Sequence, residues 1–89
     1  MGVMVAAHLR ITPLDSAITL APQVLRDLIY AHAVPTDGME HVRVRAGPQG
    51  VDVLAFVDND DPEAATEILH NVVRAAIRQE PLLRLWRII

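Results

Sequence analysis

The chain contains no cysteine, no lysine and only one residue each of tryptophan, tyrosine and phenylalanine in 89 positions. Without cysteine, the protein cannot use a disulfide framework, a thiolate zinc site or a cysteine nucleophile. Because aromatic residues are so few, the core has to be built from valine, leucine, isoleucine and alanine. The use of arginine for all eight basic residues is typical of the codon bias of a GC-rich bacterium.

The chain also has little net charge and no long hydrophobic run. A net charge of −3 argues against a broad phosphate-binding surface, so nucleic acid is not an expected partner. The apolar amino-terminal stretch begins without a basic region and is interrupted by His8 and Arg10, which argues against a signal peptide and a membrane span. We therefore expect a cytoplasmic protein with no membrane contact.

Hydrophobic residues make up 52% of the chain, which is too many for a disordered protein and enough for one core. The length predicts a single domain that covers residues 1–89. A core of this size gives limited stability by itself, and association with a second copy would add to it. A homodimer is therefore expected.

Three segments alternate between apolar and polar residues with the period of two that is typical of a strand. They are residues 4–11, 40–46 and 51–57, and a four-residue loop, 47–50, should join the last two as a hairpin. A slip of one residue in this hairpin would bury its arginines. The favoured register has these pairs: Arg45 with Asp52, Arg43 with Leu54, and His41 with Phe56.

A fourth strand is predicted at the carboxyl end, over residues 82–89. Leu83 and Leu85 alternate there with a second set of residues, which are Arg84, Trp86 and Ile88. If the leucines face the core, this second set lies on the opposite face of the sheet.

Two helices are predicted between the strands. The first covers about residues 20–33, with Thr19 as a candidate cap and Pro35 beyond its end. The second follows a run of aspartates, where an aspartate cap and Pro62 in the first turn form a strong start signal. Pro81 marks its end. Both helices have apolar residues at helical spacing, so each should cover the sheet with one side.

The elements therefore follow the order β-α-β-β-α-β. With right-handed crossovers, this order places both helices on one face of a four-stranded antiparallel sheet, which is the ferredoxin-like α+β fold. The other sheet face carries no helix, and we call it the open face. By alternation it should contain Met4, Ala6, His8, Arg10, His41, Arg43, Arg45, Asp52, Leu54, Phe56, Arg84, Trp86 and Ile88.

About half of these open-face residues are apolar or aromatic, which is unusual for a sheet surface left in solvent. The main hypothesis is a non-catalytic binding or accessory module that uses the open face for homodimerisation or for a protein partner. The residues expected at this interface are Met4, Arg10, Arg43, Arg45, Leu54, Phe56, Arg84, Trp86 and Ile88.

An alternative hypothesis is a small enzyme or ligand-binding protein. His8 and His41 are its candidate catalytic residues, because both are predicted on the open face and imidazole suits proton transfer near neutral pH. In topology the chain is similar to small dimeric α+β-barrel proteins, and this similarity would imply an apolar or anionic small molecule. No residue pattern indicates a metal site or a cofactor.

A short stretch resembles the RNA-recognition motif, a family with the same order of elements. The likeness lies in residues 54–57 and in the Asp-Pro-Glu-Ala-Ala sequence that follows them. It would imply that bases stack on aromatic residues of the sheet. However, Asp52 and Leu54 stand where that family has a basic residue and an aromatic. Phe56 alone cannot stack two or three bases, so RNA binding is not expected.

Overall fold

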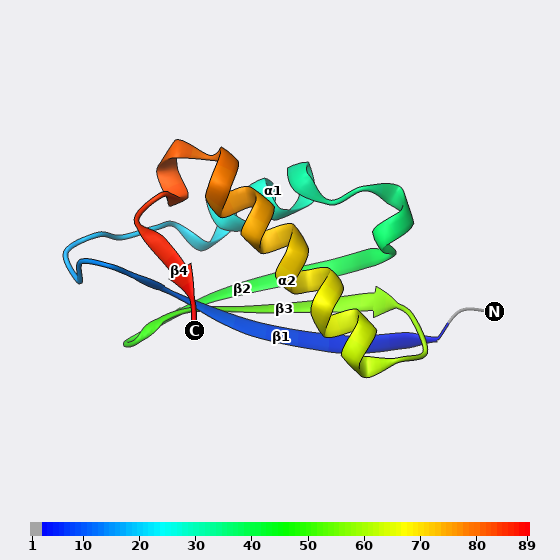
Figure 1. Ribbon diagram of the computed structural model, residues 1–89. Coiled ribbons are helices and arrows are strands. Elements are labelled where there is room, and N and C mark those ends of the chain that lie inside the picture. The colour runs from blue at the N-terminus through cyan, green and yellow to red at the C-terminus, as the bar shows by residue number, and fades with distance from the viewer. Residues whose placement is uncertain (1–2) are drawn as a thin grey trace.

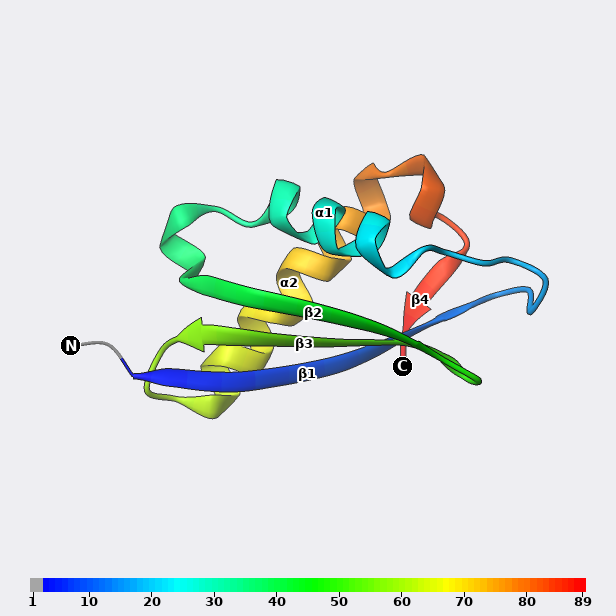
Figure 2. The same ribbon diagram turned by 180° about the vertical axis from the view of Figure 1, so that it is seen from behind.

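The computed structural model describes residues 3–89 as an α+β fold with the β-α-β-β-α-β order of the ferredoxin-like class. The elements are β1 (Met4–Pro13), α1 (Pro22–His32), η1 (Pro35–Asp37), β2 (Met39–Gly47), β3 (Gly50–Asp58), α2 (Pro62–Gln79), η2 (Pro81–Leu83) and β4 (Trp86–Ile88). The sheet order is β2-β3-β1-β4, and all neighbouring strands are antiparallel. Both helices lie on one face of the sheet (Figure 1), and the view from behind shows the same two layers (Figure 2). The predicted fold class is confirmed.

The core lies between the sheet and the two helices. Leu25 and Ile29 of α1 and Leu69 and Val73 of α2 are fully buried there. On the sheet side, alternate residues of β1 and β3 are at most 3% exposed, and these are Ala7, Leu9, Ile11, Val51, Val53, Ala55 and Val57. The apolar stripe of each helix therefore sets its position, and the other face of the sheet is left without a helix.

The two helices begin by different means. Asp61 caps α2, because its side chain accepts the Glu63 N–H at 3.0 Å, as the aspartate run predicted. The predicted Thr19 cap of α1 is wrong. This helix begins at Pro22, which suits a first turn, and Ala21 occupies the cap position with no side-chain hydrogen bond. No helix within residues 3–89 is long and apolar enough to cross a membrane.

The hairpin of β2 and β3 has the predicted register near its turn, where Arg45 lies opposite Asp52 and Arg43 opposite Leu54. Its loop is shorter than predicted. Residues 47 and 50 already pair with each other, so two residues rather than four make the turn. Gly47 and Gly50 thus add one pair to the β2–β3 ladder, beyond the predicted strands 40–46 and 51–57.

A β-bulge farther along the hairpin changes the predicted pairing of His41 with Phe56. At this point β2 has two residues, His41 and Val42, opposite one residue of β3. His41 has a φ of 52°, which is the left-handed conformation, while Val42 is buried. Glu40 therefore lies opposite Phe56, and the prediction for His41 is wrong because the inserted residue shifts the alternation by one.

The last strand differs most from its prediction. Residues 81–83 form a 3-10 turn with about three residues per turn, so Leu83 and Trp86 both face the core, at 0% and 5% exposure. Ile88 pairs with the buried Ile11 and lies on the same, helix-covered side. Arg84 lies outside the strand and is exposed. The prediction that Arg84, Trp86 and Ile88 lie on the open face is therefore wrong.

Candidate binding face

The open face is built by β1, β2 and β3 and has a regular pattern. β3 lies between the other two strands, so its outward residues are the centres of cross-strand rows. The rows are Arg45–Asp52–Arg10, Arg43–Leu54–His8 and Glu40–Phe56–Ala6, and Met4 lies beyond them opposite Asp58. The arginines are therefore concentrated near the hairpin turn, and the aromatic ring lies farther along β3.

Asp52 holds the centre of the first row. Its Oδ1 accepts a hydrogen bond from Nε of Arg10 at 2.7 Å, and Nε2 of His8 lies 3.4 Å from the same oxygen. The hydrogen bond from Arg10 is the main cause that holds the pKa of Asp52 below its usual range, and it outweighs partial desolvation. The same bond raises the pKa of Arg10. The Asp52 carboxylate is therefore already paired with Arg10 of β1.

We expect Asp52 to stay ionised below about pH 3.9, where a free aspartate protonates. Because the folded pKa is lowered, the pair stabilises the fold above that pH, and this contribution is lost as the pH falls through the folded pKa. An NMR titration of the carboxyl carbon should give a midpoint below about 3.9. Arg10→Met should raise that midpoint, and Arg43→Met, the matched control, should leave it in place. A midpoint that does not respond to Arg10 would contradict the pairing.

Arg43 and Arg45 have no such partner. In the described part of the chain neither forms an ion pair, although Asp52 lies directly opposite Arg45. Both arginines are exposed and border a hollow of about 530 Å³. The hollow is lined by His8, Arg43, Val44, Arg45, Asp52 and Leu54. Free guanidinium groups thus lie next to a half-buried leucine.

The structure brings together part of the interface predicted from the sequence. Six of its residues share the open face, and these are Met4, Arg10, Arg43, Arg45, Leu54 and Phe56. Trp86 and Ile88 lie on the core side instead, and Arg84 lies outside the sheet. The open face therefore lacks Trp86, which has the largest aromatic side chain of the predicted interface. The open face is therefore less apolar and more cationic than the alternation suggested.

The two candidate catalytic histidines belong to different parts of the sheet. His8 is in the second row, with 57% of its side chain exposed, whereas His41 occupies the bulge of β2. His8 lines the hollow of about 530 Å³, whereas His41 is not among the residues that line it. Within residues 3–89, no group of three His, Asp or Glu residues is arranged to hold a metal ion.

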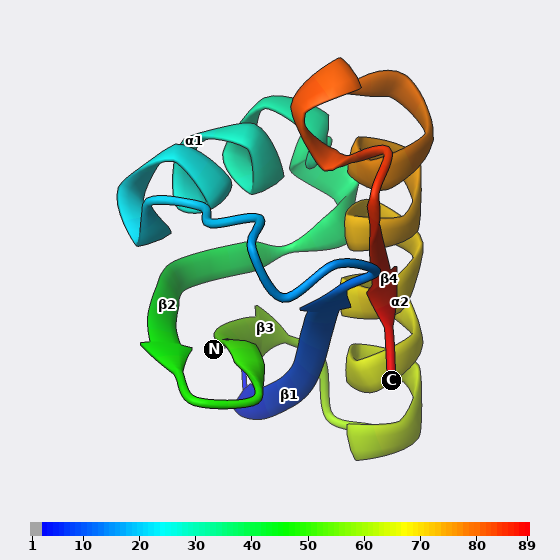
Figure 3. The same cartoon turned by 90° about the vertical axis from the view of Figure 1, so that its left-hand side faces the viewer.

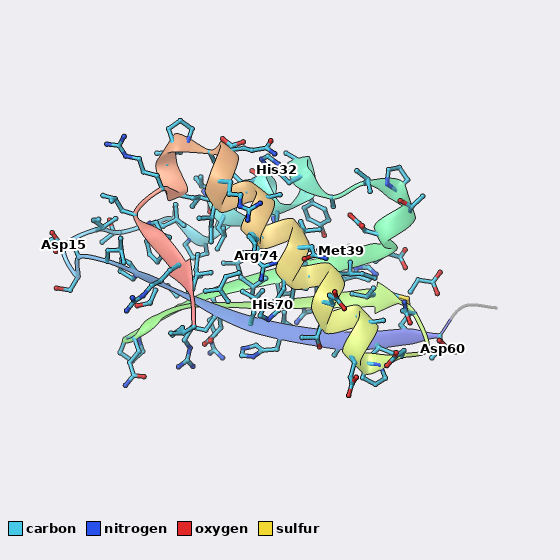
Figure 4. The ribbon with its side chains drawn as sticks, in the orientation of Figure 1. Asp15, His32, Met39, Asp60, His70 and Arg74 are labelled. Carbon is cyan, nitrogen blue, oxygen red and sulfur yellow. The ribbon has the colours of Figure 1, made fainter. Side chains whose placement is uncertain are left out.

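A second hollow, at the outer side of β1, was not expected from the sequence. It has a volume of about 450 Å³ and is lined by His8, Leu9, Arg10, His70 and Ile89. The His70 side chain extends from α2 on the side of β1 (Figure 4). The hollow lies at the end of β4, whose ladder with β1 covers only residues 11–13.

The chemistry of these two surfaces is the basis for inferring a function. Comparison with family models, with curated proteins and with solved structures finds no match for this chain.

Proposed function

We propose that the protein is a non-catalytic binding module whose open face binds an acidic segment of a partner protein. The observation that carries this proposal is the pair Arg43 and Arg45, which are exposed, line one hollow and form no ion pair within residues 3–89. Guanidinium groups bind carboxylates through two parallel hydrogen bonds, so arginines in adjacent rows suit neighbouring acidic side chains. Leu54 and Phe56 beside them would contact the aliphatic parts of such a segment.

A second copy of the chain fits the same face less well. Contact between two open faces would bring two unpaired arginines from each copy into one interface, while Asp52 is already held by Arg10. Juxtaposition of like charges in an interface costs several kcal/mol. Because Trp86 and Ile88 lie on the core side, the apolar area that could offset this cost is small. These features favour a different, acidic protein over the homodimer expected from the sequence.

An anionic small molecule is the second candidate for this face. The hollow of about 530 Å³ is within the size range of small-molecule sites. It is lined by His8 as well as by the two arginines, so a carboxylate or phosphate group would find several donors. This candidate retains the ligand-binding alternative suggested by the topology.

The test uses hexaglutamate as the probe, added to the native chain at low salt and followed by NMR. We expect shifts of the amide signals of β2 and β3, and affinity that falls as salt is added. Arg43→Glu with Arg45→Glu should lower the affinity at least about tenfold, because two exposed contacts of up to about 1 kcal/mol each become repulsive. Arg74→Glu with Arg78→Glu makes the same charge change on the exposed side of α2 and should have little effect.

Four outcomes would overturn the proposal. An equal loss of affinity in the variant with Arg74→Glu and Arg78→Glu would show that hexaglutamate is attracted by the net charge of the protein alone. Equal affinity for glutarate and for hexaglutamate would reassign the face to a small ligand, and tighter binding of single-stranded RNA would reassign it to nucleic acid. A native dimer in light scattering that Leu54→Arg dissociates would assign the face to self-association.

A further inference from the structure

Another hollow borders Arg43 where helix α1 meets the outer strand of the sheet. It has a volume of about 370 Å³, and we call it the edge hollow. It is lined by Pro22, Gln23, Arg26, Val42, Arg43 and Val44. Figure 3 shows α1 over the β2 side of the sheet and α2 over the β1 side. The edge hollow therefore lies beside the strand that carries the two unpaired arginines of the open face.

The edge hollow is adjacent to the hollow of about 530 Å³ on the open face, which we call the open-face hollow. Arg43 and Val44 line both of them. Arg45 lines only the open-face hollow, and Arg26 lines only the edge hollow. Three guanidinium groups therefore follow one path across β2, from the open face to α1.

The arginine of α1 is nearly as free to bind an acid as the two arginines of β2. Nη2 of Arg26 lies 3.7 Å from Oδ1 of Asp27, and both side chains are more than half exposed, at 51% and 71%. Exposed pairs of this kind contribute little, so Asp27 competes weakly for the guanidinium group. Of the six residues that line the edge hollow, all in the described part of the chain, none is acidic.

The backbone of β2 adds polar groups at the edge hollow. The Tyr30 hydroxyl of α1 accepts the Val42 N–H at 2.8 Å, so residue 42 directs its backbone groups away from β3. Val44 follows two residues later and directs its N–H and C=O to the same side. A peptide can bond to both of these groups, whereas an inorganic anion can use only the N–H.

On the basis of the function proposed for the open face, we propose that the acidic segment crosses β2 at Arg43 and Val44 and binds Arg26 with a further carboxylate in the edge hollow. The charges are complementary along the whole path, and each guanidinium group can hold a carboxylate through two hydrogen bonds. Arg26 is therefore a specificity-determining residue, because it favours a segment with several acidic residues over a single anion that fills one hollow.

The acidic run of a second copy does not fit as this segment. Residues 58–63 are rich in acid, but they form a fixed turn before α2. The Asn59 side chain accepts the Asp61 N–H at 2.8 Å, and the Asp61 side chain accepts the Glu63 N–H at 3.0 Å. Part of this run is thus occupied by its own backbone, and the run is not extended. A segment of a different protein avoids this conflict.

The test is a titration of the full chain with hexaglutamate at low salt, followed by NMR and calorimetry. The amide signals of Val44 and Leu54 should shift with one shared midpoint, and one peptide should bind per chain. Arg26→Glu should lower the affinity at least about fivefold, because an exposed contact of up to about 1 kcal/mol becomes repulsive. Arg74→Glu makes the same charge change on the exposed side of α2 and should lower it by less than about twofold.

Arg26→Gln keeps the test valid if the new acid disturbs α1. It removes the charge without reversing it and should lower the affinity about twofold or more, because a contact of up to about 1 kcal/mol is lost. Glutarate, which fills only one hollow, should bind more weakly than hexaglutamate. Two peptides per chain, or separate midpoints for Val44 and Leu54, would overturn the proposal, since the two hollows would then bind independently.

Arg45→Glu separates this proposal from the function on which it rests, because Arg45 lines only the open-face hollow. Losses of affinity in both Arg45→Glu and Arg26→Glu support one segment across both hollows. A loss in Arg45→Glu, with Arg26→Glu equal to Arg74→Glu, would overturn the crossing of β2 and leave the open-face function standing. A loss in Arg26→Glu alone would overturn both, because acid would then bind only in the edge hollow.

Discussion

Gly50→Ala should lower the free energy of unfolding by about 3 kcal/mol or more, because both the conformation and the space at this position require glycine. Gly50 has a φ of 143°, which L side chains rarely adopt, and an added Cβ would lie 2.3 Å from the carbonyl oxygen of Ile11. That oxygen belongs to the backbone of β1 in the centre of the sheet, so it cannot move aside as a flexible side chain could. Thermal unfolding followed by circular dichroism should show a drop of roughly 12–24 °C.

The partner glycine of the same turn is the matched control for this prediction. A Cβ on Gly47 would find only the Gly50 carbonyl oxygen nearby, at 3.7 Å, which is an ordinary contact. Gly47→Ala should therefore change the melting temperature by only a few degrees, which corresponds to less than about 1 kcal/mol. A similar drop in melting temperature in both variants would show that the turn tolerates neither substitution. The close approach to Ile11 would then not be the cause of the destabilisation in Gly50→Ala.

Trp86→Ala should cost about 3–5 kcal/mol, because it removes a large side chain from the end of the core. Trp86 is 5% exposed and lines a small hollow together with Ile18, Leu20 and Val51. Its Nε1 is buried without a hydrogen-bond partner among the described residues, so Trp86→Phe should cost much less: it keeps most of the apolar contact and removes the unpaired donor. Urea unfolding of the three proteins measures both differences.

The same variants test which face of the sheet Trp86 occupies. On the core side, the single tryptophan should fluoresce at short wavelength in the native state, and folded Trp86→Phe should bind hexaglutamate as the native chain does. If Trp86 instead lay on the open face, Trp86→Ala would leave the urea midpoint nearly unchanged and would weaken binding. That outcome would contradict the register of β4.

The open face could be predicted from the sequence wherever strands alternate regularly. The pairs of Arg45 with Asp52 and of Arg43 with Leu54 follow from the position of the turn and from burial, because a slip of one residue would place the arginines in the core. The ion pair of Asp52 was not predictable in the same way. Asp52 lies between arginines on both neighbouring strands, and its choice of Arg10 depends on side-chain geometry across the sheet.

The sequence by itself determined the order of the elements, the capped start of α2 and the residues that β1 and β3 place in the core. These features depend on residues that are close together in the chain, through alternation, helical spacing and capping. Only the tertiary structure decided the bulge at His41 and the burial of Trp86. Each of these depends on where segments far apart in sequence meet, since one inserted residue or one 3-10 turn reverses which side chains face the core without disturbing the local pattern.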